Sequence, residues 1–318
     1  MDISKSAMIA VRDCMGVKPE EKVLIVTDSV RKDLGWPLYN AALELGCDAL
    51  YLEMKPRSRS GEEPPSMVAQ AMMNSDVIMA ATKVSLSHTQ ARKNACKNGA
   101  RCASIPIQEP DANLVIKMFS QGGMIADYKK MDTNIDRLLQ RVKGSKTARI
   151  VTKLGTDITI EYEGREFHKD NGLALNKGDF TNLPGGEIYL APVNSYGKIV
   201  IDGSFGDYGL LSYPLELIVR DNHVVTANGD HADDLQVLFD RLGNDARNIA
   251  ELGIGMNPTS TLCGILLEDE KVGNTVHIAL GDNTGFGGNV SVSLHLDGII
   301  TEPTVYIDGE TLTLSDYL

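Results

Sequence analysis

The chain has 318 residues and carries 43 acidic against 31 basic residues, which gives a formal net charge of −12 at pH 7. Binding to nucleic-acid phosphates needs concentrated lysine and arginine, so this charge argues against a nucleic-acid groove. With 42% apolar residues the composition is globular, but no apolar run approaches the ~20 residues that a membrane span requires. The N-terminus lacks the apolar core of a signal peptide, and five scattered cysteines without CxxC spacing suit reduced thiols. We expect a cytoplasmic protein of two domains that binds neither nucleic acid nor membranes.

The first half of the chain alternates short apolar strands with helical segments. The strands are predicted at residues 21–28, 48–54, 75–82 and 100–106, with glycines 46 and 99 closing two of the helices between them. This alternation is typical of an α/β domain with a doubly wound, mostly parallel sheet, which we place at residues 1–145. Ligands of such sheets bind at the carboxyl ends of the strands. No glycine-rich nucleotide motif follows the first strand.

The pattern changes near residue 147. From there the sequence alternates apolar and polar residues and is interrupted by turn glycines such as Gly155 and Gly164, which is typical of antiparallel hairpins. We predict a second, β-rich domain over residues 146–318, with a barrel-like or sandwich arrangement favoured over an open sheet.

Two apolar strands of this second domain contain histidines. His277 lies in TVHIALG, and His295 and Asp297 lie two residues apart in SLHLDG, so that both project from one face of a strand. Glu187 begins EIYLAP and Glu251 lies in AELGIG. Imidazole and carboxylate oxygen together suit zinc, manganese, cobalt or ferrous iron, bound in a facial triad or in half of a dinuclear site.

Simpler interpretations stand beside this one. A strand histidine is often a core residue with satisfied hydrogen bonds, and a His-x-Asp pair on a sheet face can be an ion pair. Glu187 alone would be a turn carboxylate, and Glu251 a carboxylate at the end of a helix.

Four motifs that follow one another in this order favour the metal site over these simpler interpretations: NLPGGEIYLAP, AELGIGMNP, DEKVGNTVHIALG and SLHLDG. Together with VLIVTD, GEEPP and SLSHTQARKNACKNGARCASIP in the first half, they make nearly the whole chain resemble the thermophilic metallopeptidases of the aminopeptidase T and aminopeptidase S group. The resemblance implies two divalent ions per chain (zinc, cobalt or manganese), a homodimer, and metal ligands at Glu187, Glu251, His277, His295 and Asp297. A metal-activated water would then attack the peptide bond, with Glu251 or Glu270 as the general base. Taken by itself, Glu270 would lie in an exposed charged turn.

Two further positions bear on this reading. His88 follows the third strand, where it would reach the substrate or stand beside a helix capped by Ser87. The segment Gly281–Asn289 has Asn283 and Thr284 where the resemblance leads us to expect a tyrosine that stabilises an oxyanion.

The leading hypothesis is therefore a metal-dependent aminopeptidase-like hydrolase acting on short peptides. The same fold is similar to that of the dihydroxypyridine ring-cleaving dioxygenases, which hold one Fe(II) with two histidines and an aspartate. In this chain His277, His295 and Asp297 would fill those three places. A third hypothesis is a catalytically altered protein of this fold that binds a metal or a small molecule.

Overall fold

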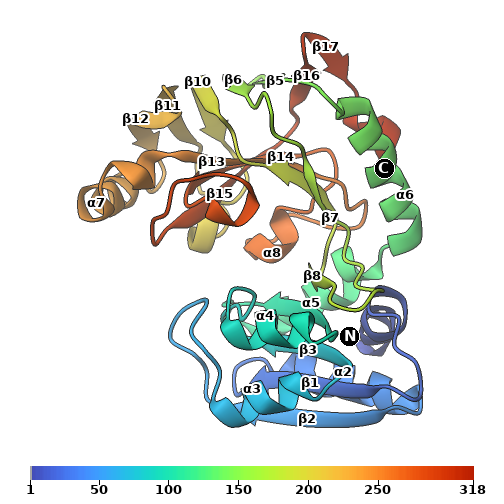
Figure 1. The fold of residues 1–318 in the computed structure, drawn as a ribbon. Coiled ribbons are helices and arrows are strands. Elements are labelled where there is room, and N and C mark those ends of the chain that lie inside the picture. The colour runs from blue at the N-terminus through green and yellow to red at the C-terminus, as the bar shows by residue number, and fades with distance from the viewer. Residues whose placement is uncertain (1) are drawn as a thin grey trace. The chain divides into compact units, whose positions relative to one another are not determined.

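The computed structural model describes residues 2–318, which form two compact units (Figure 1). Unit 1 consists of the chain up to Tyr128 together with Asp170–Gly185, and unit 2 consists of Lys129–Lys169 together with Gly186–Leu318. The boundary predicted after residue 145 differs from this division in two places. Helix α6 (Tyr128–Val142) lies almost wholly in unit 2, and the segment Asp170–Gly185 returns to unit 1.

Both differences have a physical cause. Helix α6 belongs to unit 2 because its side chains pair there: Arg141 with Glu310, and Asp132 and Asp136 with Lys169. The returning segment carries strand β8 (Phe180–Asn182), which pairs with β4 of the parallel sheet. A strand of three residues is too short to produce a recognisable alternation in the sequence.

Unit 1 contains a five-stranded sheet of order β2-β1-β3-β4-β8, in which all neighbouring strands are parallel. Besides β8, its strands are β1 (Lys22–Asp28), β2 (Asp48–Met54), β3 (Val77–Thr82) and β4 (Arg101–Pro106). Its helical segments are α1 (Ser4–Met8), η1 (Ile9–Cys14), α2 (Lys32–Glu44), α3 (Ser66–Met73), α4 (Gln90–Lys97), α5 (Ala112–Gln121) and η2 (Gly123–Ile125). The four strands predicted in this half are all present, and the parallel α/β sheet is confirmed.

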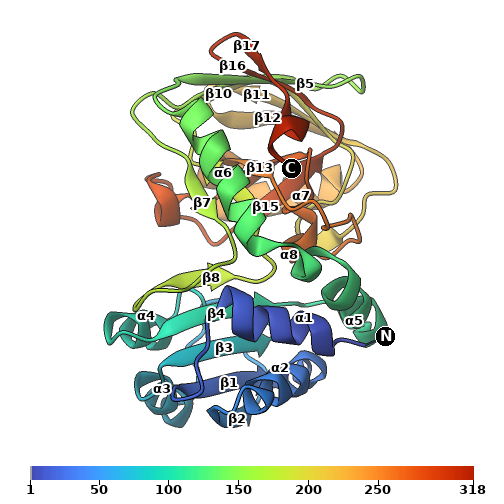
Figure 2. The ribbon, with the colours of Figure 1, turned by 90° about the vertical axis from the view of Figure 1, so that its right-hand side faces the viewer.

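The chain order of unit 1 places helices on both faces of this sheet. The connection through α2 runs from β1 to β2, whereas those through α3 and α4 run in the opposite direction across the sheet. Because such crossovers are right-handed, α2 covers one face while α3 and α4 cover the other (Figure 2). Apolar residues of α3 and α4 accordingly pack with Leu24, Ile78 and Ala80 in one buried cluster.

Unit 2 contains two sheets. The larger, of order β12-β11-β10-β6-β5-β16-β17, is antiparallel. Its strands are β5 (Thr147–Val151), β6 (Asp157–Glu161), β10 (Asn194–Ile201), β11 (Leu215–Arg220), β12 (His223–Gly229), β16 (Thr304–Ile307) and β17 (Glu310–Leu312). The smaller has the order β15-β14-β13-β9-β7, with β7 (His168–Asp170), β9 (Glu187–Leu190), β13 (Ile249–Gly255), β14 (Val276–Gly281) and β15 (His295–Ile300).

Short helices complete unit 2. They are α7 (Ala232–Leu242), α8 (Leu266–Asp269) and the 3₁₀ segments η3 (Gly206–Tyr208), η4 (Asn244–Arg247), η5 (Thr284–Phe286) and η6 (Leu314–Tyr317). The antiparallel character predicted for this part of the chain is confirmed. Closure into a barrel is not seen in the order of the described strands, since each sheet has two edge strands. No helix among residues 2–318 combines the length and apolar character needed to cross a bilayer.

Candidate metal centre

The five predicted metal ligands come from four neighbouring strands of the smaller sheet. Glu187 opens β9, Glu251 lies on β13, His277 on β14, and His295 and Asp297 on β15. In the strand register Glu187 is opposite Gly255, Gly253 is opposite His277, and Ala279 is opposite Asp297. Because side chains alternate along a strand, this register projects all five from the same face of the sheet.

Glu251 lies between the two histidines. Its Oε1 is 3.5 Å from Nε2 of His277, and its Oε2 is 3.4 Å from Nε2 of His295. On the outer sides, Glu187 Oε2 is 3.2 Å from Nε2 of His277, and Asp297 Oδ1 is 3.6 Å from Nε2 of His295. The ligand atoms therefore form two groups, Glu187–Glu251–His277 and Glu251–His295–Asp297, each within 4.8 Å and both including Glu251.

Several polar atoms of this cluster are buried without a hydrogen-bond partner in the described part of the chain. His277 is fully buried, and neither of its ring nitrogens makes a hydrogen bond; the same is true of Glu187 Oε2, whose approach to His277 lacks hydrogen-bond geometry. Orphaned buried polar groups of this kind are rare and costly. A cation between these atoms would satisfy them, so the donor set fits a bound divalent metal ion.

The imidazole of His295 is also oriented to bind a metal ion. Its Nδ1 lies 2.9 Å from the backbone oxygen of Asp282, to which it donates a hydrogen bond in the neutral Nδ1–H tautomer. That tautomer leaves a lone pair on Nε2, the atom that faces Glu251 and Asp297. A hydrogen bond from the second ring nitrogen to a backbone carbonyl is the usual support of a metal-binding histidine.

Lys271 adds a fixed positive charge that the sequence did not indicate. Its side chain is fully buried, and its Nζ lies 2.5 Å from Glu187 Oε1 and 2.9 Å from Glu270 Oε1. Lys271 thus holds one oxygen of Glu187 and leaves the other directed toward His277. The expectation that Glu270 lies in an exposed charged turn was wrong: the segment DEK packs inward, and Asp269 is itself buried as the acceptor of the backbone N–H groups of Cys263 and Gly264.

Two glycines of β13 make room for this arrangement. A Cβ on Gly253 would lie 1.9 Å from Nε2 of His277, so the imidazole occupies the space above that glycine. A Cβ on Gly255 would lie 2.0 Å from the backbone oxygen of Val272, directly after Lys271. The sequence Glu-x-Gly-x-Gly in AELGIG therefore supplies one carboxylate and two openings on the same face of the strand.

Charge coupling sets the protonation of the cluster. Burial alone would raise the pKa of Glu251, but its contacts with His277 and His295 lower it to about 2. Burial would lower the pKa values of both histidines; the neighbouring carboxylates outweigh that effect and raise them well above the usual value. Burial raises the pKa of Glu270 to about 8, against the opposing effect of Lys271.

These shifts predict that metal binding releases protons. At pH 7 the raised pKa values leave the imidazoles protonated, and a divalent ion must displace those protons to reach the nitrogens. We expect the apparent metal affinity to rise with pH, and calorimetric titration of the metal-free protein in buffers of different ionisation enthalpy to show net proton release. Metal uptake without proton release would place the ion elsewhere.

His88 does not lie on the smaller sheet that carries this cluster. It belongs to unit 1, where it is exposed in the turn between β3 and α4. The expected helix cap was assigned to the wrong residue: Thr89, rather than Ser87, caps α4, since its Oγ1 accepts the backbone N–H of Arg92 at 3.2 Å. A catalytic role for His88 stays a prediction.

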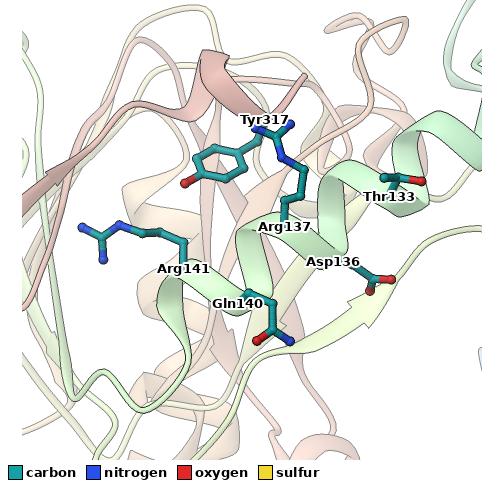
Figure 3. A pocket seen from close by; sticks show the side chains of 6 residues that line it. All are labelled: Thr133, Asp136, Arg137, Gln140, Arg141 and Tyr317. Carbon is teal, nitrogen blue, oxygen red and sulfur yellow. The ribbon is translucent and has the colours of Figure 1, made fainter.

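A surface hollow on unit 2 lies apart from the predicted site residues (Figure 3). Its charged side chains already have partners, since Arg137 lies over the ring of Tyr317 at 5.4 Å and Arg141 pairs with Glu310. None of the five predicted ligands lines it; the residues that do are Thr133, Asp136, Arg137, Gln140, Arg141 and Tyr317. The cluster on the smaller sheet remains the better candidate for chemistry.

Comparison with known proteins decides the family. The family model of 2,5-dihydroxypyridine 5,6-dioxygenase (NicX) matches residues 6–315. The chain belongs to the NicX family. Comparison with curated protein sequences finds no match.

Solved structures extend this assignment at the level of the fold. A 2,5-dihydroxypyridine dioxygenase from Pseudomonas putida KT2440 superposes on this NicX-family chain with a TM-score of 0.79 at 14% identity, covering 98% of this chain and 95% of that one. AmpT from Thermus thermophilus gives 0.70 at 15% identity, covering 98% and 96%. At such identities the likeness shows a common fold. The fold shared by the aminopeptidase T group and the dihydroxypyridine dioxygenases, expected from the motifs, is therefore confirmed.

Proposed function

We propose that this chain is a metal-dependent ring-cleaving dioxygenase that opens a dihydroxylated nitrogen heteroaromatic ring such as 2,5-dihydroxypyridine. The match to the NicX family over residues 6–315 carries the proposal. It favours the second of the sequence hypotheses over the aminopeptidase that we placed first. His277, His295 and Asp297 supply the two-histidine, one-carboxylate set typical of mononuclear Fe(II) oxygenases.

The roles of the side chains follow from their positions. His277, His295 and Asp297 would hold the ion, with Glu251 as a further oxygen donor between the imidazoles. A bound ferrous ion supplies the redox chemistry with dioxygen that ring cleavage needs. The contacts with both histidines that lower the pKa of Glu251 to about 2 suit this carboxylate to a ligand role better than to that of a base. Glu270, with a pKa of about 8, is better suited to exchange a proton with a substrate hydroxyl near neutral pH.

The aminopeptidase remains the second candidate on one observation. Glu187, Glu251 and His277 form a second group of possible ligands that shares Glu251 with the first, as a dinuclear hydrolase site would. The two functions differ in metal content and in cosubstrate. The dioxygenase needs one ferrous ion and dioxygen, whereas the peptidase needs two divalent ions and no dioxygen.

The test is oxygen consumption by protein loaded anaerobically with Fe(II). We expect oxygen uptake with 2,5-dihydroxypyridine, together with loss of the ring absorbance, at about one iron per chain. His277→Ala should abolish turnover and weaken metal binding by more than about 100-fold, since loss of an outer partner alone costs 10–100-fold.

His223→Ala is the matched control, because His223 lies on β12 of the other sheet and its ring nitrogen Nδ1 contacts the backbone oxygen of Asp221. Its metal content and turnover should equal those of the wild type. Two ions per chain with release of amino acids from short peptides, and no oxygen uptake, would establish the peptidase instead. Metal binding without either reaction would leave a binding protein of this fold.

A further inference from the structure

A row of four aromatic rings runs outward from the candidate metal centre. The ring of Phe286 stands edge-on to the imidazole of His295, with centroids 6.0 Å apart and an interplanar angle of 88°. Tyr189 contacts Phe286 in the same manner at 5.5 Å, and His168 lies against Tyr189 at 5.6 Å. These separations and angles are typical of attractive aromatic contacts. The row links a predicted ligand to the edge strand β7.

Tyr189 is placed by the sheet itself. It is two residues after Glu187 on β9 and opposite Gly253, so it projects from the face that carries the predicted ligands. Gly253 separates it from His277 on the next strand. The tyrosine is only partly buried. Its ring therefore stands at the border of the cluster.

Phe286 is placed by the loop that follows β14. Asn283, which is 2% exposed, accepts the backbone N–H of Val290 through its Oδ1 at 2.9 Å, and its backbone oxygen accepts from Gly288 at 2.9 Å. A Cβ on Gly288 would lie 1.9 Å from Cγ of Asn283, so the glycine leaves room for that amide. This segment, where the aminopeptidase resemblance predicts a tyrosine, instead fixes a phenylalanine ring beside His295.

We propose that Phe286 and Tyr189 form an aromatic wall that binds the planar ring of the substrate next to the metal. The inference rests on the proposed function and names the side chains that recognise its flat substrate ring. A rigid aromatic surface recognises a flat ring by apolar contact and edge-to-face geometry, and it costs little conformational entropy because the loop is already fixed. The hydroxyl groups would then face the metal ligands.

Equilibrium binding tests the wall without turnover. Protein loaded with Fe(II) is titrated under anaerobic conditions with 2,5-dihydroxypyridine, and separately with oxalate, a chelator without a ring. Phe286→Ala should raise the Kd for the dihydroxypyridine about tenfold, with metal content and oxalate affinity unchanged. Phe286→Tyr should restore the wild-type Kd. Tyr196→Ala, at an exposed tyrosine on β10, is the matched control and should change neither affinity.

The outcomes separate this inference from the proposed function. If Phe286→Ala lowers the affinities for 2,5-dihydroxypyridine and oxalate equally, or lowers neither, the aromatic wall is contradicted even where oxygen uptake proceeds. If 2,5-dihydroxypyridine is not turned over but still binds in a manner that depends on Phe286, the dioxygenase proposal is contradicted and the aromatic wall is supported. Should Phe286→Ala fold poorly, Phe286→Leu and Tyr189→Leu keep most of the packing volume and give the same comparison of ring with oxalate.

Discussion

Replacing Lys271 with methionine is expected to lower the free energy of unfolding by about 3–5 kcal/mol. The ammonium group is fully buried between the carboxylates of Glu187 and Glu270. Removing it takes the counter-charge from Oε1 of Glu187 and from Glu270, and breaking a buried ion pair costs much more than the pair itself contributes. Urea denaturation of the metal-free protein measures the difference, with a lowered midpoint at an unchanged slope.

Lys198→Met serves as the control for charge removal. Lys198 pairs with Glu216 at 2.9 Å on the larger sheet, but about a third of its side chain is exposed. Surface substitutions of this kind usually stay within about 0.5 kcal/mol. A double variant, Glu187→Gln with Lys271→Met, should recover part of the lost stability because it removes both charges. Equal changes in the free energy of unfolding for Lys271→Met and Lys198→Met would show that the buried ion pair contributes no more to stability than the surface pair.

Lys271 also marks a limit of sequence analysis at this site. The segment LLEDEK has four charged residues in a row, a pattern that usually belongs to a solvated turn. Glu268, Asp269 and Lys271 are buried because backbone N–H groups and an ion pair compensate their charges. These partners come from Thr261, Cys263 and Glu187. Such distant partners leave no local trace in the sequence.

His277, His295 and Asp297 were predicted as ligands because they break the apolar pattern of their own strands, whereas Glu187 and Glu251 were added through the resemblance to the aminopeptidases. His277 and Asp297 are polar residues inside apolar runs, which is a local signal. The register that aligns Ala279 with Asp297 and Gly253 with His277 is not local, since it depends on strand pairing. For the same reason the alternation of strands and helices predicted the parallel sheet, whereas the pairing of the short β8 with β4 was missed.

The choice between the two reactions depended on two carboxylates. Retention of Glu187 and Glu251 favoured two metals and hence the aminopeptidase. In the structure one oxygen of Glu187 is engaged by Lys271, and Glu251 lies between two imidazoles. Each carboxylate thus has contacts within the protein, so the presence of both does not by itself require two ions. The match to the NicX family model is the observation that favours the dioxygenase over the aminopeptidase.

Gly253→Ala is expected to disable the metal centre without touching a ligand. The added methyl group would lie 1.9 Å from Nε2 and 2.2 Å from Cε1 of His277, whose side chain is fully buried and cannot move aside freely. Overpacking of this kind typically costs about 1–3 kcal/mol. Displacing the imidazole should weaken metal binding by at least the 10–100-fold that loss of a supporting partner causes. Metal titration followed by calorimetry or by competition with a chromophoric chelator gives the affinity.

Gly285→Ala separates this steric effect from the general effect of adding a methyl group. A Cβ at Gly285 meets nothing within 4 Å, and neither glycine has the positive φ that would strain an alanine. A Gly→Ala change in open space reduces the entropy of the unfolded chain and stabilises a protein by about 0.4–1 kcal/mol. The two substitutions should therefore shift stability in opposite directions, and only Gly253→Ala should reduce metal affinity. Wild-type metal affinity in Gly253→Ala would mean that His277 is not a ligand, because its imidazole cannot keep its place above an alanine.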